Sequence, residues 1–163
     1  MFRWSACQMR AVPGGDALFD RCASCQRCCH IDPGYGPLEV TLTQSEQHRL
    51  GSVCIETQCP HLSSNGCALG DTKPFACSMY PLSYDPHHRQ YSLDVECPLA
   101  LGYLEDFADP ETAAGKHLRQ AMETIQHLEI SEPGFLLENH SIDSEFFDLQ
   151  RIPVELMLDL RKQ

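Results

Sequence analysis

The sequence predicts a small, α-rich α+β fold, in which a cysteine-rich module with one short β-hairpin packs against C-terminal helices. The chain has 163 residues, 42% of them hydrophobic, which suits one domain with a modest core. Nine of its ten cysteines lie between Cys22 and Cys97, and an apolar stripe with helical spacing follows them. We therefore expect a single domain over residues 1–163, divided into a cysteine-cluster module at 22–98 and an acidic helical tail at 104–163.

The first half of the module contains a loop and one short helix. Residues 22–36 are predicted to form a cysteine loop that a Pro-Gly-Tyr-Gly turn closes. Thr43 and Glu46 have the spacing of a capping box, in which the hydroxyl and the carboxylate bind free amides of the first helical turn. This motif predicts a helix over about 44–51 that Gly51 stops.

The second half of the module combines a loop with a hairpin. Residues 54–77 contain four cysteines with Pro, Gly and Asn between them, so we expect a loop that something other than a hydrophobic core must hold. Residues 80–84 and 90–96 are predicted strands, joined by an Asp-Pro-His-His-Arg turn.

The tail is expected to be mostly helical. Asp109, followed by Pro and Glu, predicts a helix N-terminus. An apolar stripe with helical spacing continues from it, at Ala114, Leu118, Ala121, Met122, Ile125 and Leu128. Pro133 and Gly134 are predicted to end this unit. The stretch 144–162 is expected to be broken at Pro153 and to finish as a helix.

The charge of the chain limits its partners. The formal net charge is −11, and residues 98–163 hold 13 acidic against 5 basic residues. We expect no nucleic-acid partner, because phosphate binding needs clustered Lys and Arg, and no membrane span, because no apolar run approaches the roughly 18–20 residues required. The acidic tail could bind a basic protein partner, but scattered acids are more often a solvated face.

The start of the chain bears on the role of the cysteines. Residues 1–15 lack the continuous apolar run of a secretion signal, and we expect a cytoplasmic protein. Disulfides are rare in reducing cytosol, where dense cysteine more often binds metal or does redox work.

The run Cys22, Cys25, Cys28 and Cys29 is the sharpest motif. Its steps of three place three sulfur atoms around one small volume, as in ferredoxin-type runs whose fourth ligand lies in a remote Cys-Pro. Both Cys59 and Cys97 precede a proline. Zinc would accept the same thiolates in a tetrahedral site.

A second, wider set gives further candidate ligands. It comprises Cys54, Cys59, Cys67 and Cys77, in a loop that would gain stability by closing around a metal. His30 and His61, beside ligand cysteines, are less favoured alternative ligands. A redox role for the vicinal pair Cys28 and Cys29 is a minor alternative.

The order of these motifs resembles the CxxCxxCC family of zinc- or iron-chelating cysteine-cluster proteins. The resemblance covers about residues 22–98 and rests on the opening run, Cys59-Pro-His-Leu, Asn65-Gly-Cys, Lys73-Pro-Phe-Ala-Cys, Tyr80-Pro81 and Cys97-Pro98. The chain departs from the family pattern in having Lys73 where Arg is usual, and Ala68-Leu-Gly after Cys67. Neither change removes a sulfur atom.

The resemblance implies a metal or iron–sulfur site. Some members are described as Fe–S cluster oxidoreductases, and a similar cluster occurs in flagellin lysine methylases, but this chain shows no methyl-donor motif and no nucleotide loop. Eight cysteines match the family: Cys22, Cys25, Cys28, Cys29, Cys59, Cys67, Cys77 and Cys97. Eight thiolates exceed one four-ligand site, so two metal centres or one polynuclear centre are both open. Cys7 and Cys54 stand outside the matched set.

Three functions remain open on this basis. We favour a cytoplasmic protein that binds an iron–sulfur cluster, or iron, and has a redox role. The first alternative is a module in which zinc organises loops for an interaction. The second is an enzyme whose catalysis occurs at the metal, for which the sequence names no catalytic residue and no substrate.

Overall fold

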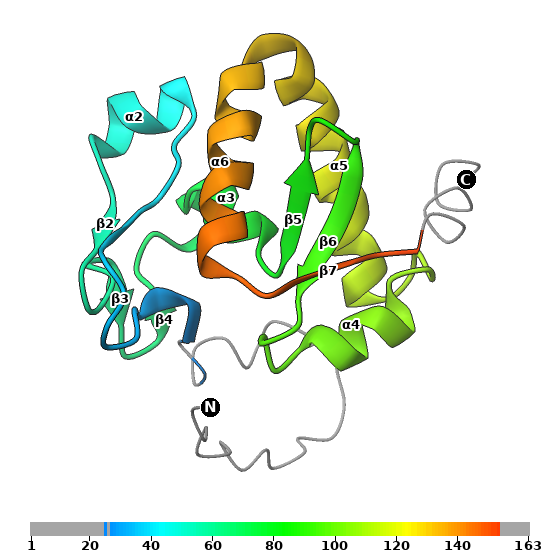
Figure 1. The fold of residues 1–163 in the computed structure, drawn as a ribbon, viewed down its shortest axis with the longest axis horizontal. Coiled ribbons are helices and arrows are strands. Elements are labelled where there is room, and N and C mark those ends of the chain that lie inside the picture. Colours follow the sequence, from blue (N-terminus) through cyan, green and yellow to red (C-terminus); the bar gives the residue numbers. More distant parts are fainter. Residues whose placement is uncertain (1–24, 26, 154–163) are drawn as a thin grey trace.

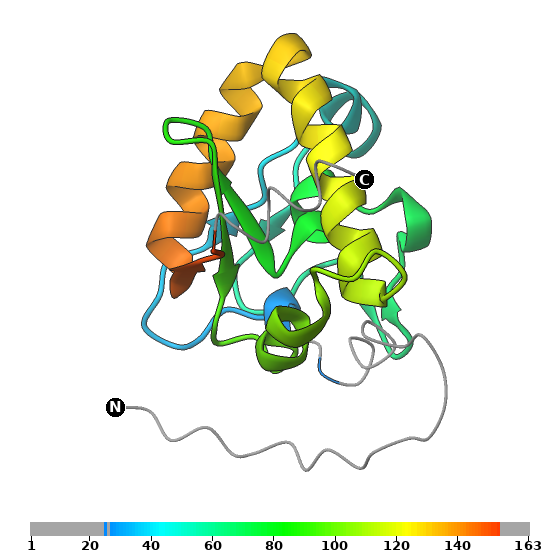
Figure 2. The same ribbon diagram turned by 90° about the vertical axis from the view of Figure 1, so that its right-hand side faces the viewer.

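Two long helices and a small antiparallel sheet carry most of the interior (Figures 1 and 2). The structure is a computed structural model that describes residue 25 and residues 27–153. Its elements are, in order, the 3-10 helix η1 (Arg27–Cys29), β1 (Leu38–Glu39), α2 (Gln44–Leu50), β2 (Cys54–Ile55), β3 (Leu62–Ser63), β4 (Gly66–Cys67), the 3-10 helix η2 (Gly70–Thr72), α3 (Phe75–Met79), β5 (Leu82–Asp85), β6 (Gln90–Asp94), α4 (Ala100–Asp106), α5 (Ala113–Ser131), α6 (Pro133–Phe146) and β7 (Leu149–Arg151). The α+β fold class is confirmed. In the described part of the chain, no helix meets the length and hydrophobicity of a membrane span.

The predicted hairpin forms and gains a third strand. Strands β5 and β6 pair antiparallel, with Leu82 opposite Leu93 and Asp85 opposite Gln90. Strand β7 adds to the free edge of β6, with Ser92 opposite Arg151. The addition of β7 could not be foreseen locally, because this strand comes from a segment more than fifty residues downstream.

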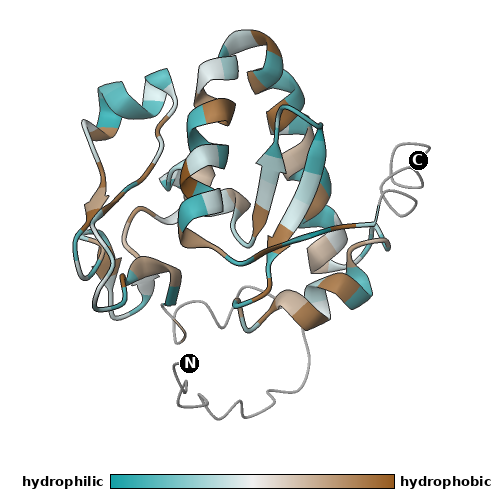
Figure 3. Cartoon of the chain, viewed as in Figure 1, coloured by the Kyte–Doolittle hydropathy of each residue, from teal (hydrophilic) through white to brown (hydrophobic). Residues whose placement is uncertain are grey.

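The main core lies between this sheet and the helices. Helices α5 and α6 run antiparallel and diverge from their connecting turn, with the hairpin between them (Figure 2). The stripe predicted on α5 is buried in full, and hydrophobic positions alternate with hydrophilic ones around both helices (Figure 3). Tyr103 of α4, Phe107, Met79 of α3 and Leu93 of β6 are almost completely buried in the same cluster.

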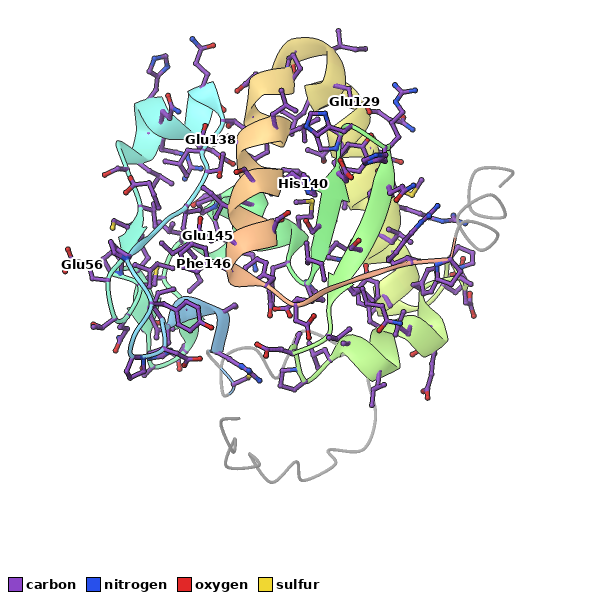
Figure 4. All side chains as sticks on the ribbon, in the orientation of Figure 1. Glu56, Glu129, Glu138, His140, Glu145 and Phe146 are labelled. Carbon is purple, nitrogen blue, oxygen red and sulfur yellow. The ribbon has the colours of Figure 1, made fainter. Side chains whose placement is uncertain are left out.

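The cysteine module has a smaller core of its own. Its buried members are Leu38, Val40, Leu42, Val53 and Ile55. Ile142 and Phe146 of α6 pack against them, and Phe146 is labelled in Figure 4 at the end of α6. Helix α6 therefore touches both clusters and joins the tail to the module.

Helix α2 follows the predicted capping box. The Thr43 hydroxyl accepts a hydrogen bond from the Glu46 amide, while the Glu46 carboxylate accepts one from the Thr43 amide at 2.9 Å. Gly51 ends the helix with φ of 73°, a left-handed conformation that glycine adopts without strain.

Helix α5 starts later than predicted. Its N-cap is Thr112, whose hydroxyl accepts a hydrogen bond from the Gly115 amide at 3.0 Å, so the expectation of an Asp109 cap is wrong. Asp109 instead stabilises the preceding turn by accepting from the Glu111 amide at 2.9 Å. Gly115 explains the shift, because a Cβ there would lie 1.8 Å from the Asp109 carbonyl oxygen.

The remaining differences concern short elements. Helix α5 does end before Pro133 and Gly134, at Ser131, but these two residues then form the first turn of α6, where proline is favoured because it lacks an amide hydrogen. The expected loop at 54–77 contains β2, β3, β4, η2 and most of α3. The helical end expected within 144–162 lies largely outside the described residues, and its described part holds the end of α6 and β7.

Candidate metal centre

Helix η1 is tied to the segment before Cys59 by backbone hydrogen bonds. The Cys59 amide donates to the Cys29 carbonyl at 2.7 Å, and the Ile31 amide donates to the Thr57 carbonyl at 3.0 Å. His30 forms an isolated antiparallel bridge with Gln58. The end of the CxxCxxCC run, at Cys29, is therefore held beside the Cys59-Pro segment, although some thirty residues separate them in sequence.

Cys59 lies at the start of a tight turn that exposes amides to its sulfur atom. The backbone N–H groups of His61 and Leu62 both hydrogen-bond the Cys59 thiol. Leu62 of β3 then pairs with Cys67 of β4, which returns the chain beside the turn. Amides aimed at a sulfur atom stabilise its thiolate, which is the form that binds metal.

Cys77, on helix α3, completes a group of four thiols. Desolvation and then the charges of Cys59, Cys29 and Cys67 raise its pKa from 9.0 to about 12, although part of the residue is exposed. These charges act through space, which places the four thiols in one region of the module, although no three of them form a group that could hold a metal ion. The Cys59 pKa is also raised, by desolvation and by Cys29 and Cys67, against the two amide hydrogen bonds. We call Cys29, Cys59, Cys67 and Cys77 the four-thiol group.

Cys29 is the most acidic member of this group. A hydrogen bond from the Cys28 side chain lowers the Cys29 pKa from 9.0 to about 6, opposed by desolvation and assisted by His30 and Lys73. These contacts favour the thiolate form of Cys29. The positive charge of Lys73 also opposes the pKa rise at Cys77.

A second contact joins η1 to the residue that precedes Cys97. Arg27 donates from its guanidinium to the Glu96 carbonyl at 2.8 Å, which joins the residues that precede Cys28 and Cys97. Tyr80 donates a 2.6 Å hydrogen bond to Asp94. Its pKa is raised by desolvation, by this hydrogen bond and by the charges of Cys97, Asp94 and Cys28.

The other candidate residues lie apart or outside the described chain. Cys25 is exposed, whereas Cys22 and Cys7 lie outside the described residues. Cys54 stands opposite Glu39 in the β1–β2 pair. Desolvation and the carboxylates of Glu39 and Glu56 raise its pKa. Glu56 is labelled at the outer edge of the module in Figure 4.

Sequence reasoning missed the charged and phenolic neighbours of the thiols. Lys73 was noted only as a departure from a family pattern, and Tyr80 only for the proline that follows it. Asp94 and Glu96 carried no motif. The Cys-Pro signal at Cys97 did point to this region, but it could not show which side chains surround it.

The described donors do not surround a common point. Across residue 25 and residues 27–153, no three His, Cys, Asp or Glu side chains form a group that could hold a metal ion. The thiols do suit a thiophilic metal by chemistry, and a cation would have to draw them together. A hollow of about 280 Å³ lies elsewhere, near Arg89 and Glu129, and no cysteine lines it.

Comparisons with known proteins add nothing to these observations. No protein-family profile, no curated protein and no solved structure matches this chain.

Proposed function

We propose that this chain is a cytoplasmic metal-binding protein that holds an iron–sulfur cluster, or iron, through its cysteine set, in a redox role. One observation carries the proposal. The four-thiol group draws its members from η1, from the turn before β3, from β4 and from α3. Four thiols from four separate segments are the set of ligands that a structural metal centre requires.

The cost of keeping these thiols together supports a cation among them. Desolvation raises the pKa of Cys77 to about 12, and the charges of neighbouring thiols add to the rise. A bound metal replaces the thiol protons, so binding releases protons and relieves the repulsion between these charges. Lys73 supplies one nearby positive charge, but a single lysine cannot balance four thiolates.

The hydrophobic core supports this region only through partly buried residues, among them Cys59, Phe75 and Ala76. None of its buried hydrophobic residues lies between Ile55 and Met79 in the sequence, and this interval contains the three cysteines Cys59, Cys67 and Cys77. Strands β3 and β4 contain two residues each. Since elements this short have little stability of their own, metal binding would supply folding free energy for the segment.

Zinc is the second candidate, and the turn at Cys59 favours it. In the turn at Cys59, two backbone amides hydrogen-bond one sulfur atom, and the hairpin that follows brings a second cysteine back toward the turn. This arrangement suits a site in which four thiolates bind a single metal ion. In that case the module would organise loops for a partner, and the metal would show no redox change.

The proposal is tested by metal analysis of anaerobically purified full-length variants. Cys59→Ser and Cys77→Ser should lose metal and unfold at lower temperature, because each removes one donor of the four-thiol group. Cys54→Ser is the matched control and should keep the wild-type metal content. Full metal content in both Cys59→Ser and Cys77→Ser would contradict the proposal.

A further inference from the structure

The His117 ring on helix α5 bridges the two short helices α3 and α4. Its Nε2 atom lies 2.7 Å from the carbonyl oxygen of Ser78 on α3, and its Nδ1 atom lies 2.8 Å from the hydroxyl of Tyr103 on α4. The rings of Tyr103 and His117 also meet edge to face, with centroids 5.6 Å apart. One side chain of α5 therefore contacts both helices.

These two contacts suit the neutral form of the ring in one tautomer. A carbonyl oxygen can only accept a hydrogen bond, so Nε2 carries the hydrogen and donates it to Ser78. In a neutral imidazole the other nitrogen is an acceptor, and the Tyr103 hydroxyl donates to Nδ1. Both polar hydrogens then have an acceptor.

The Ser78 carbonyl depends on this bond. It lies in the last turn of α3, which ends at Met79, and carbonyls in the last turn of a helix lack an amide of their own helix. Three residues after Ser78 stands Pro81, which has no amide hydrogen to offer. The donor that the structure gives to this carbonyl is the His117 ring.

A proton on Nδ1 would disturb this arrangement. An imidazolium donates from both nitrogens, so the Tyr103 oxygen would have to accept from Nδ1 and turn its own hydrogen elsewhere. Tyr103 is completely buried, and in the described part of the chain its hydroxyl has no hydrogen-bond partner other than His117. A buried donor that loses its acceptor is destabilising.

The charged and titratable neighbours of the ring come from α4 and from the segment before α3. Desolvation lowers the pKa of His117 below its usual 6.5; the hydrogen bond to Ser78 opposes this fall, and the positive charge of Lys73 assists it. On the α4 side, desolvation raises the pKa of Tyr103, which keeps its hydroxyl uncharged. Burial and charge therefore act in the same direction as the hydrogen bonds, against an imidazolium.

We infer that His117 is an acid-sensitive latch, which holds α3 against α4 and α5 while its ring is neutral and releases α3 when the ring gains a proton. Release would uncover Met79, which α3 contributes to the main core. The latch itself requires no metal. Because α3 also carries Cys77, release would displace a candidate ligand as well, and this consequence alone rests on the proposed function.

Hydrogen–deuterium exchange of the full-length protein tests the latch. The exchange of α3, corrected for intrinsic rates, is followed between about pH 7.5 and 5.5 in wild type and in His117→Gln, whose amide can donate to Ser78 but does not titrate. In wild type, α3 should open up to about tenfold more often for each pH unit below 6.5, because the released ring binds a proton that the held ring excludes. His117→Gln should lack this dependence.

A control variant separates the latch from other titrating groups. His127→Gln removes an exposed histidine from the same helix and should keep the pH dependence of wild type. Asp143 titrates in all three proteins, so its contribution cancels in the comparison. Equal pH dependence of α3 opening in wild type and His117→Gln would overturn the inference.

The ring nitrogens provide a measurement that needs no variant. In full-length protein labelled with nitrogen-15 at histidine, magnetic resonance should show the hydrogen of His117 on Nε2 and a bare Nδ1. This state should persist at pH values that already protonate exposed histidines. A hydrogen on Nδ1 at neutral pH, or protonation of His117 together with exposed histidines, would overturn the latch.

Discussion

One carboxylate oxygen of Glu46 lies 2.8 Å from the backbone nitrogen of Phe75, the first residue of α3. The other oxygen closes the capping box of α2 with Thr43. A single side chain therefore caps two helices, and the second helix carries Cys77. The first turn of α3 would otherwise have an amide without a protein acceptor.

Replacing Glu46 should loosen both helices. Glu46→Ala removes the two hydrogen bonds that this charged carboxylate accepts. Each is worth at most about 1.5–3 kcal/mol of unfolding free energy, and because the side chain is partly exposed we expect a smaller total loss. Chemical denaturation measures the free energy of unfolding. Glu56→Ala, on the exposed edge of the module, should change it by less than about 0.5 kcal/mol. Equal stability of the two variants would contradict the role given to Glu46.

Gly115 should tolerate no side chain. In Gly115→Ala the new Cβ would lie 1.8 Å from the Asp109 carbonyl oxygen, so the backbone must move, at a cost of about 1–3 kcal/mol or more. Gly102→Ala is the control, because its Cβ meets nothing within 4 Å in the middle of α4. That change should stabilise the protein by about 0.5–1 kcal/mol. Thermal unfolding should move in opposite directions for the two variants.

Asp143 should make stability depend on pH. Its carboxyl is buried beside Ser83 and Asn139, and desolvation, with a contribution from Asp94, raises its pKa from 3.8 to about 7. Between these values the folded state keeps a proton that the unfolded state has lost. The free energy of unfolding from this group therefore falls as pH rises, by about 1.4 kcal/mol per pH unit.

The variant Asp143→Asn isolates that contribution. Its stability relative to wild type should rise between pH 4 and 7, by about 1.4 kcal/mol per pH unit. Glu145→Gln changes an exposed residue on the same helix and serves as control. A stability difference between Asp143→Asn and wild type that stays constant with pH would show that Asp143 ionises normally.

Lys73 should strengthen metal binding through its charge. It lowers the pKa of Cys29 and opposes the rise at Cys77, so Lys73→Gln makes thiolate formation more costly. Because Lys73 is exposed, solvent limits the effect to about 0.2–1 kcal/mol, which is up to about fivefold in affinity. Cobalt titration followed by thiolate absorbance measures it, with Lys116→Gln as control. Equal affinities for the two variants would exclude the electrostatic role.

Local signals predicted those parts of the fold that depend on nearby residues. The capping box at Thr43, the hairpin around residues 85–89 and the buried stripe of α5 all formed, because each pattern is completed within a few turns of chain. The start of α5 was misplaced because Gly115 packs on the backbone of Asp109, a close approach that composition does not reveal. Strand β7 needed a partner from far away in the sequence.

The same distinction between local and long-range signals applies to the candidate site. Spacing and resemblance named the eight candidate ligands, but not which of them lie in one region of the module. That grouping depends on the hydrogen bonds that tie η1 to Cys59 and to Glu96, across about thirty and seventy residues of chain. Lys73 and Tyr80 belong to motifs of the resemblance, but those motifs do not show that the two side chains lie near the thiols.

The central claim is that this chain binds metal through its cysteines, and elemental analysis of the wild-type protein tests it most directly. Full-length protein would be isolated under strict exclusion of oxygen, then assayed for iron, zinc and acid-labile sulfide per chain. The account predicts a brown protein that contains iron and labile sulfide. A colourless protein with stoichiometric zinc and no iron would contradict the iron–sulfur assignment, and a folded protein with no metal at all would contradict the account as a whole.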